Sequence, residues 1–328
     1  MDSFMNNLDK IQNLLGDDLL RMNNVIRESL KTPNELMDRV VTNYLAVKGK
    51  QIRPIMVLLS AHLFGDVNED ALHAGAALEM LHNASLIHDD VVDDTDLRRG
   101  RDTINREWGN HIAVLMGDFF VSNALAAGIK TGNISIISTL SDLGKKLATG
   151  EVEQICNARE HSFEEERYLE MINKKTACLF ESCVKMGAES NGVAPEEYKA
   201  LGEYGRLLGL CFQIRDDIFD YTASAEIGKP TGNDLREGKV TMPLLYALRT
   251  APESESQPMK EFLVRGDLTT GEIERLIDFA IEHGGIEYAY SRMRAMQKEA
   301  EHLLDPYPDS KWKESFRELF EYIISRNN

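Results

Sequence analysis

Apolar residues recur at helical spacing along almost the whole chain of 328 residues, and no stretch alternates convincingly between apolar and polar residues. This spacing gives each segment one apolar face, which a helix buries by packing on other helices. With 43% hydrophobic residues, the chain can bury a large core. The pattern predicts an all-α protein built as a single large helical bundle.

Prolines divide this pattern into separate helices. Pro33, Pro54 and Pro195 stand near expected helix starts, whereas Pro252 and Pro258 are expected to break the C-terminal third. We expect helices over residues 3–30, 34–47, 54–64, 69–93, 107–130, 134–159, 164–190, 196–222, 240–250, 270–284, 286–304 and 310–325. No low-complexity linker or shift in composition divides the chain, so we expect one domain over residues 1–328.

Charge and targeting signals limit the partners that the chain can have. The formal net charge of −17 argues against nucleic acid, because no overall basic field would attract phosphate backbones. Aspartates at positions 2, 9, 17 and 18 do not fit a signal peptide. The most apolar stretch, 112–129, contains Asp118 and is read as a buried helix rather than a stable membrane anchor. We therefore expect a cytoplasmic protein.

Two aspartate clusters share the same internal spacing: Asp89-Asp90-Val91-Val92-Asp93 and Asp216-Asp217-Ile218-Phe219-Asp220. In each cluster, the first and last aspartates lie about one helical turn apart on the same face. One such cluster on an acidic protein is usually a solvated helix face, but each of these follows a strongly apolar segment, where carboxylates need compensation. Hard oxygen ligands suit Mg²⁺, and two facing clusters would offer six carboxylates to a central cavity.

Basic residues stand close to both clusters in the sequence or in separate groups. They are Lys50, Arg53, Arg98, Arg99, Arg101, Lys174, Lys175, Lys229 and Lys239. Each group alone is more often surface charge, but together they suit a diphosphate, to which lysine offers a point charge and arginine a bidentate fork. A mononucleotide site is disfavoured, because no GxGxxG occurs and Val240 replaces the Ser or Thr that a Walker A loop needs after its lysine.

Three sequence runs together resemble one enzyme family. They are LIHDDVVDDTDLRRG (86–100), FQIRDDIFD (212–220) and GKPTGNDLREGK (228–239), and they are similar to the trans-isoprenyl diphosphate synthases, the head-to-tail prenyltransferases. The resemblance extends from Lys48 to about residue 243 and implies the isoprenoid synthase fold and a homodimer. One departure is visible, because the usual GGKRxRP of the family reads KGKQIRP over 48–54, which retains both basic ligand positions.

The resemblance also implies an activity and a set of site residues. The family condenses isopentenyl diphosphate with an allylic prenyl diphosphate, and two to three Mg²⁺ ions grip the allylic diphosphate. The metal positions correspond to Asp89, Asp90, Asp93, Asp216, Asp217 and Asp220. The allylic diphosphate contacts correspond to Arg98, Lys175, Lys229 and Lys239, and the isopentenyl diphosphate contacts to Lys50, Arg53, His82 and Arg99. Thr176 and Gln213 match positions that could steady the carbocation, although helix packing would also explain them.

The residues before the first cluster bear on product length. Ala84 and Ser85 precede Asp89 by about one helical turn, and both are small. In the family, an aromatic residue here stops chain growth at farnesyl or geranylgeranyl length, although small residues also allow ordinary close helix packing. Ala84 and Ser85 therefore predict a long all-trans product, in the hexaprenyl to decaprenyl range.

Other functions fit parts of the pattern. A short-chain farnesyl or geranylgeranyl diphosphate synthase would share every motif except the small residues. A terpene cyclase would use one DDxxD, but its second metal motif typically mixes Asn or Asp, Ser or Thr and Glu. A non-catalytic subunit of a heteromeric synthase usually loses one or both clusters. An HD-type phosphohydrolase would need further histidines at metal-ligand positions, which the eight scattered histidines do not supply.

Overall fold

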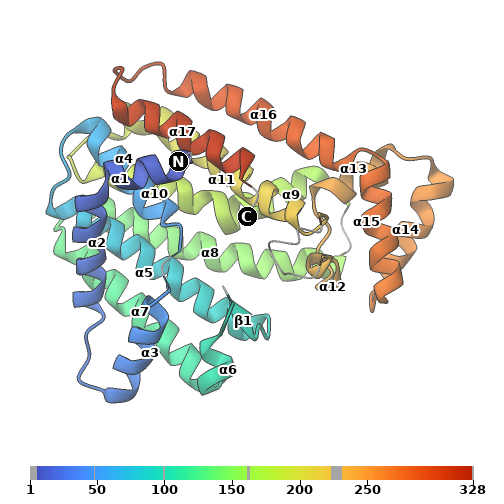
Figure 1. The fold of residues 1–328 in the computed structure, drawn as a ribbon, viewed down its shortest axis with the longest axis horizontal. Coiled ribbons are helices and arrows are strands. Elements are labelled where there is room, and N and C mark those ends of the chain that lie inside the picture. Colours follow the sequence, from blue (N-terminus) through green and yellow to red (C-terminus); the bar gives the residue numbers. More distant parts are fainter. Residues whose placement is uncertain (1–5, 48, 99, 161–162, 223–230, 327–328) are drawn as a thin grey trace, which may run out of the picture. The chain divides into compact units, whose positions relative to one another are not determined.

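The computed structural model describes residues 6–47, 49–98, 100–160, 163–222 and 231–326. In these residues nearly all regular structure is helical, and the strands are one short antiparallel pair that aligns Leu97 with Asp102 (Figure 1). The expected all-α class is confirmed.

The elements follow one another along the chain. They are α1 (Asn7–Leu14), α2 (Gly16–Ser29), α3 (Glu35–Leu45), α4 (Ile52–Phe64), α5 (Glu69–Val92), β1 (Leu97–Arg98), β2 (Arg101–Asp102), α6 (Ile104–Trp108), α7 (Asn110–Lys130), α8 (Ile134–Glu160), α9 (Glu165–Ile172), the π-helical turn η1 (Asn173–Ala177), α10 (Cys178–Glu189), α11 (Pro195–Phe219), α12 (Asn233–Arg236), α13 (Met242–Thr250), α14 (Glu253–Arg265), α15 (Thr270–Glu282), α16 (Gly285–Leu303) and α17 (Lys311–Ser325).

Several helix expectations are wrong in detail. The expected helix over 3–30 is interrupted at Leu15, next to Gly16, where glycine lowers the cost of leaving the helix. Pro258 does not break the chain but lies inside α14. This helix buries Ser256, Met259 and Leu263, and packing of this face compensates for the hydrogen bond that proline cannot donate.

The chain forms two compact units. Unit 1 comprises Met1–Gly144, Ser182–Gly202 and Tyr307–Phe316, and unit 2 comprises Lys145–Glu181, Glu203–Pro306 and Arg317–Asn328. The expectation of one domain over residues 1–328 stays a prediction.

Helix α5 forms the centre of unit 1. The Asn68 side chain caps its start by accepting the N–H of Ala71. The helix packs along α7 and also against α2 and α4. Its alanines are wholly buried, including Ala76, Ala77 and Ala84. Burial on most of its surface explains why α5 has no clear amphipathic pattern.

Helix α7 buries only part of its surface. Among the described residues, it is the one helix that is long and apolar enough to cross a membrane by length and composition. Val114, Leu115, Leu125 and Ile129 leave an apolar face open to solvent. The expectation of a buried helix is therefore right for only one side of α7.

In unit 2, α8 approaches the π-helical turn η1 very closely. A Cβ atom on Gly150 of α8 would lie 2.9 Å from the backbone nitrogen of Lys175 and 3.1 Å from the carbonyl carbon of Lys174. Only glycine allows this approach without a shift of one helix. The turn η1 interrupts the path from α9 to α10, and π-helical turns of this kind often occur at functional sites.

We expect Gly150→Ala to lower the free energy of unfolding by about 1–3 kcal/mol, because the added methyl overpacks the contact with η1. Gly144→Ala is the matched control on the same helix, since a Cβ there meets nothing within 4 Å. The control should leave stability unchanged or raise it by up to about 1 kcal/mol, as helix propensity dictates. Urea denaturation measures both, and equal effects of the two substitutions would contradict the close contact.

Candidate active site

The first aspartate cluster lies at the C-terminal end of α5 in unit 1. Asp90 is buried and forms an ion pair with Arg98 of β1, whose Nε and terminal nitrogen lie 2.8 and 2.7 Å from one carboxylate oxygen. Burial raises the pKa of Asp90, and the paired guanidinium opposes this rise. Asp89 is half-buried, whereas Asp93 is the exposed residue that caps the helix. Arg98 is therefore held against the cluster by Asp90.

The other expected residues of unit 1 lie on α4 and α5. Lys50 precedes α4, and Arg53 lies in its first turn. His82 lies on α5 and is 8% exposed. Ala84 is completely buried, and the Ser85 hydroxyl donates a hydrogen bond to the His82 carbonyl oxygen at 2.9 Å. Arg99, expected beside them, lies outside the described residues.

The second aspartate cluster, in unit 2, has a different partner for each carboxylate. Asp216 accepts a hydrogen bond from Arg326, whose guanidinium also stacks on the Phe212 ring at 4.2 Å. The two oxygens of Asp220 accept the backbone N–H groups of Asn233 and Asp234, each at 3.0 Å. Asp220 therefore holds the start of α12.

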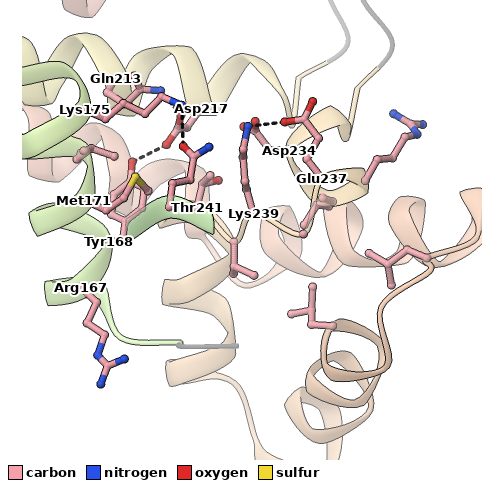
Figure 2. A pocket seen from close by; sticks show the side chains of 18 of the residues that line it. Arg167, Tyr168, Met171, Lys175, Gln213, Asp217, Asp234, Glu237, Lys239 and Thr241 are labelled. Atoms are coloured by element: carbon pink, nitrogen blue, oxygen red, sulfur yellow. Dashed lines mark hydrogen bonds and ion pairs between the residues drawn. The ribbon is translucent and has the colours of Figure 1, made fainter. Parts of the chain in front are cut away.

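Asp217 is the most enclosed residue of this cluster. Its two oxygens accept hydrogen bonds from the Tyr168 hydroxyl at 2.5 Å and from the Gln213 amide at 2.8 Å (Figure 2). Gln213 in turn accepts a hydrogen bond from the Thr176 hydroxyl at 2.7 Å. The structure thus connects Thr176 and Gln213, which the sequence singled out, and adds Tyr168, which it did not.

The expected lysines of unit 2 have acidic partners. The Lys175 ammonium lies 2.7 Å from a Glu151 oxygen and donates a hydrogen bond to the Gln154 side chain at 3.0 Å. Lys239 forms an ion pair with Glu237. Lys229 lies outside the described residues. Glu151 beside Lys175 was not expected from the sequence, because nothing in the primary order relates α8 to η1, whereas Glu237 stands two residues before Lys239.

A cavity of about 410 Å³ in unit 2 brings most of these groups together. The site residues in its lining are Gln154, Tyr168, Lys175, Thr176, Gln213, Asp217, Asp234 and Lys239 (Figure 2). Acidic, cationic and neutral polar groups therefore face one enclosed space, next to apolar side chains such as Ile172, Leu235 and Leu268. Such a lining suits a ligand with a polar head and an apolar tail.

Negative charge is crowded around this cavity. Burial raises the pKa of Asp217, and the nearby charge of Asp234 raises it further. Asp234 and Asp220 also have raised pKa values, with burial as the main cause. The pKa of Tyr168 is raised well above its usual value by burial and by Asp217, so the phenol remains a donor at neutral pH. A nearby cation would relieve this crowding.

The described side chains include no ready-made metal cage, since no three or more His, Cys, Asp or Glu residues are grouped to hold an ion. A cage is not required for Mg²⁺, which keeps several waters and takes one or two carboxylates together with substrate phosphates. The hard, partly desolvated carboxylates of the second cluster fit an ion of this kind.

The raised pKa values predict a pH dependence of stability in the presence of a chelator. The pKa of Asp217 and Asp234 lies above the unfolded value of about 4. At pH values between the unfolded and the folded pKa, the folded state therefore binds more protons than the unfolded state. Their contribution is present at low pH and is lost as pH rises through the folded pKa. The free energy of unfolding of the wild type should therefore fall between about pH 5 and pH 8. In Asp234→Asn, this fall should be smaller by about 1 kcal/mol.

Chemical denaturation at the two pH values measures this difference. Asp278→Asn, which removes an exposed carboxylate on α15, is the control and should retain the wild-type pH dependence. A wild-type pH dependence in Asp234→Asn would show that the two acids do not interact.

Comparisons with known proteins agree with this geometry. The polyprenyl synthetase family model matches residues 34–280. The octaprenyl diphosphate synthase of Haemophilus influenzae is 34% identical and aligns over 98% of this chain and 97% of its own. A polyprenyl synthase from Caulobacter crescentus CB15, solved in complex with calcium and isoprenyl diphosphate, is 32% identical, with a TM-score of 0.92 and 98% coverage of both chains.

A geranylgeranyl pyrophosphate synthase from Bacteroides thetaiotaomicron is 39% identical, with a TM-score of 0.84 over 98% of this chain and 99% of that one. The similar proteins thus include enzymes named for long and for short products. The family match covers more than half of the chain, and the named relative aligns over nearly all of it. The chain therefore belongs to the polyprenyl synthetases, the trans-isoprenyl diphosphate synthases, and is a prenyltransferase.

Proposed function

We propose that this prenyltransferase condenses isopentenyl diphosphate with an allylic diphosphate of the dimethylallyl, geranyl, farnesyl or geranylgeranyl type. The product is one isoprene unit longer after each step, and pyrophosphate is released. The cavity of unit 2 carries the proposal, because it joins Asp217, Lys175 and Lys239 to the polar side chains of Thr176 and Gln213. The isoprenyl diphosphate and calcium bound to the Caulobacter relative support this class of ligand.

Metal binding is assigned to both aspartate clusters, with two to three Mg²⁺ ions. The proposed ligands are Asp89, Asp90, Asp93, Asp216, Asp217 and Asp220. The burial that raises the pKa of Asp90, Asp217 and Asp220 supports this assignment, because a bound cation would favour their charged forms. When bound, Mg²⁺ would neutralise the charge that develops on the departing diphosphate.

The side chains of the protein supply the remaining steps. Lys175, Lys239, Lys229 and Arg98 are proposed to bind the allylic diphosphate, and Lys50, Arg53, His82 and Arg99 to bind isopentenyl diphosphate. Lys175 must exchange its ion pair with Glu151 for a phosphate oxygen. Thr176 and Gln213 would direct oxygen lone pairs at the allylic cation while the double bond of isopentenyl diphosphate attacks it. Loss of a proton then completes the step, with pyrophosphate as the proposed base.

Elongation of radiolabelled isopentenyl diphosphate tests the reaction, with each allylic primer, in Mg²⁺ and in excess chelator. We expect turnover by the purified chain alone and none without the metal. Asp216→Asn should lower kcat at least about 100-fold, because it removes charge that acts on the leaving group. Asp278→Asn, on the exposed face of α15, should leave kcat unchanged.

Several outcomes would contradict this assignment. Turnover in chelator would remove the metal from the mechanism. A cyclic hydrocarbon formed without isopentenyl diphosphate would identify a terpene cyclase. Activity that appears only after another chain is added would identify one subunit of a heteromeric synthase.

The product is proposed to be a long all-trans chain, in the hexaprenyl to decaprenyl range. Ala84 is completely buried on α5, and Ala76 and Ala77 continue the line of small side chains toward the start of the helix. Small residues leave room along this face, which an aromatic ring would close. The octaprenyl diphosphate synthase relative supports the long product.

We expect Ala84→Phe to shorten the main product without abolishing turnover, as measured by mass spectrometry of the dephosphorylated prenols. Because Ala84 is completely buried, phenylalanine could overpack the core. Ser85→Phe is therefore a second variant, at a half-buried position on the same helix. Ala126→Phe, on the exposed side of α7, is the control. Unchanged product length in both test variants would place the chain-length determinant elsewhere.

A homodimer and a cytoplasmic location complete the proposal. The apolar face of α7 formed by Val114, Leu115, Leu125 and Ile129 supports self-association, because such a face is costly to leave in water. A second copy of the chain would cover it and would remove any need for a membrane.

A further inference from the structure

Four side chains around the second aspartate cluster form one continuous hydrogen-bonded chain. Tyr168 of α9 and Gln213 of α11 both donate to Asp217, at 2.5 and 2.8 Å. Thr176 of η1 donates to Gln213 at 2.7 Å. The two oxygens of Asp217 are thus shared between Tyr168 and Gln213 (Figure 2). The chain continues from Gln213 to Thr176.

The direction of every bond in this chain follows from Asp217. The amide nitrogen of Gln213 donates to one Asp217 oxygen and the Tyr168 hydroxyl donates to the other, so Asp217 only accepts in this arrangement. The Gln213 carbonyl oxygen then faces Thr176, and the Thr176 hydroxyl donates its one hydrogen bond to that oxygen. The lone pairs of Thr176 remain for another partner. Both Thr176 and Gln213 line the cavity.

Burial makes the arrangement rigid. Tyr168 and Asp217 are each 4% exposed, and Thr176 is 8% exposed. In such a setting, an unpaired polar group is costly, so each member holds its neighbour in one orientation. Loss of the Tyr168 hydroxyl would free one Asp217 oxygen and let the carboxylate turn.

Helix α9, which carries Tyr168, is itself fixed by a second group of contacts. Glu165, about one turn before Tyr168, accepts hydrogen bonds from Arg249 at 2.9 Å and from Tyr288 at 2.8 Å. Arg292 lies 3.3 Å from the same carboxylate. These contacts connect α9 to α13 and α16. They hold α9 in place, and α9 in turn positions the Tyr168 hydroxyl against Asp217.

We propose that Tyr168 is a positioning residue that acts through Asp217 to aim Gln213 and Thr176 at the allylic cation. The inference rests on the proposed prenyl transfer. Tyr168 forms no bond to substrate and keeps its proton throughout. Its hydroxyl fixes the orientation of the Asp217 carboxylate. The carboxylate fixes the orientation of the Gln213 amide, and the amide fixes the direction of the Thr176 lone pairs. An aimed pair of oxygen dipoles stabilises the cation long enough for isopentenyl diphosphate to capture it before water does.

The test compares Tyr168→Phe with Tyr198→Phe. Tyr198 donates a hydrogen bond at 2.9 Å to the buried Glu189 in unit 1, so the control loses the same kind of bond at a carboxylate outside the proposed network. For both variants we would measure kcat, the KM of each substrate, the Mg²⁺ midpoint, and the fraction of primer converted to the allylic alcohol. The alcohol reports cations captured by water.

At saturating Mg²⁺, we expect Tyr168→Phe to lower kcat about 10-fold and to raise the alcohol fraction, with KM unchanged. Tyr198→Phe should change thermal stability only. The double variant Tyr168→Phe/Thr176→Val should lose no more activity than the worse single variant, because both act through one network.

Other results would overturn the inference. An unchanged kcat and alcohol fraction in folded Tyr168→Phe would show that the hydroxyl orients nothing. A shifted Mg²⁺ midpoint with an unchanged alcohol fraction would show that Tyr168 acts on metal binding alone, and multiplied losses in the double variant would separate Tyr168 from Thr176. If Tyr168→Phe does not fold, 4-fluorophenylalanine at position 168 keeps the shape and removes the donor, and an unchanged kcat and alcohol fraction there would also overturn it. A wild-type protein that elongates no primer would instead contradict the proposed function.

Discussion

Buried negative charge at the end of α11 is the constraint on which the candidate site depends. Asp217 is 4% exposed, and the charge of Asp234 adds to the cost of ionising it. The surrounding structure meets this cost with directed donors: a phenol, an amide, two backbone N–H groups on Asp220 and the Arg326 guanidinium on Asp216. These donors come from α9, α11, α12 and the C-terminal end, so four segments converge on the charge at the end of α11.

The sequence was sufficient for the fold class and for the family, and it proposed most residues of the candidate site. Helical periodicity identified nearly every long helix, because burial of one face is a local property of the pattern. The aspartate clusters and lysines were recognisable by spacing and motif. Asp234 could also have been proposed from the sequence, because it lies inside the GKPTGNDLREGK run, from which only the two lysines were assigned.

Other parts of the site depend on tertiary contacts that no local pattern encodes. Tyr168 lies far from Asp217 in the chain and meets it only because α9 and α11 pack together. Glu151 reaches Lys175 because Gly150 lets α8 approach η1. Pro258 misled the helix assignment for a related reason, since the buried face of α14 outweighs one missing hydrogen bond. Packing decided each of these cases.

The central claim is that the carboxylates and lysines together form a site for a diphosphate bridged by divalent metal. The most direct measurement is the thermal unfolding midpoint of the purified protein with inorganic pyrophosphate alone, with Mg²⁺ alone, and with both. Linkage predicts a rise with both ligands that exceeds the sum of the separate rises, because each ligand completes the site for the other. An equal rise with pyrophosphate in the presence of chelator would contradict the claim.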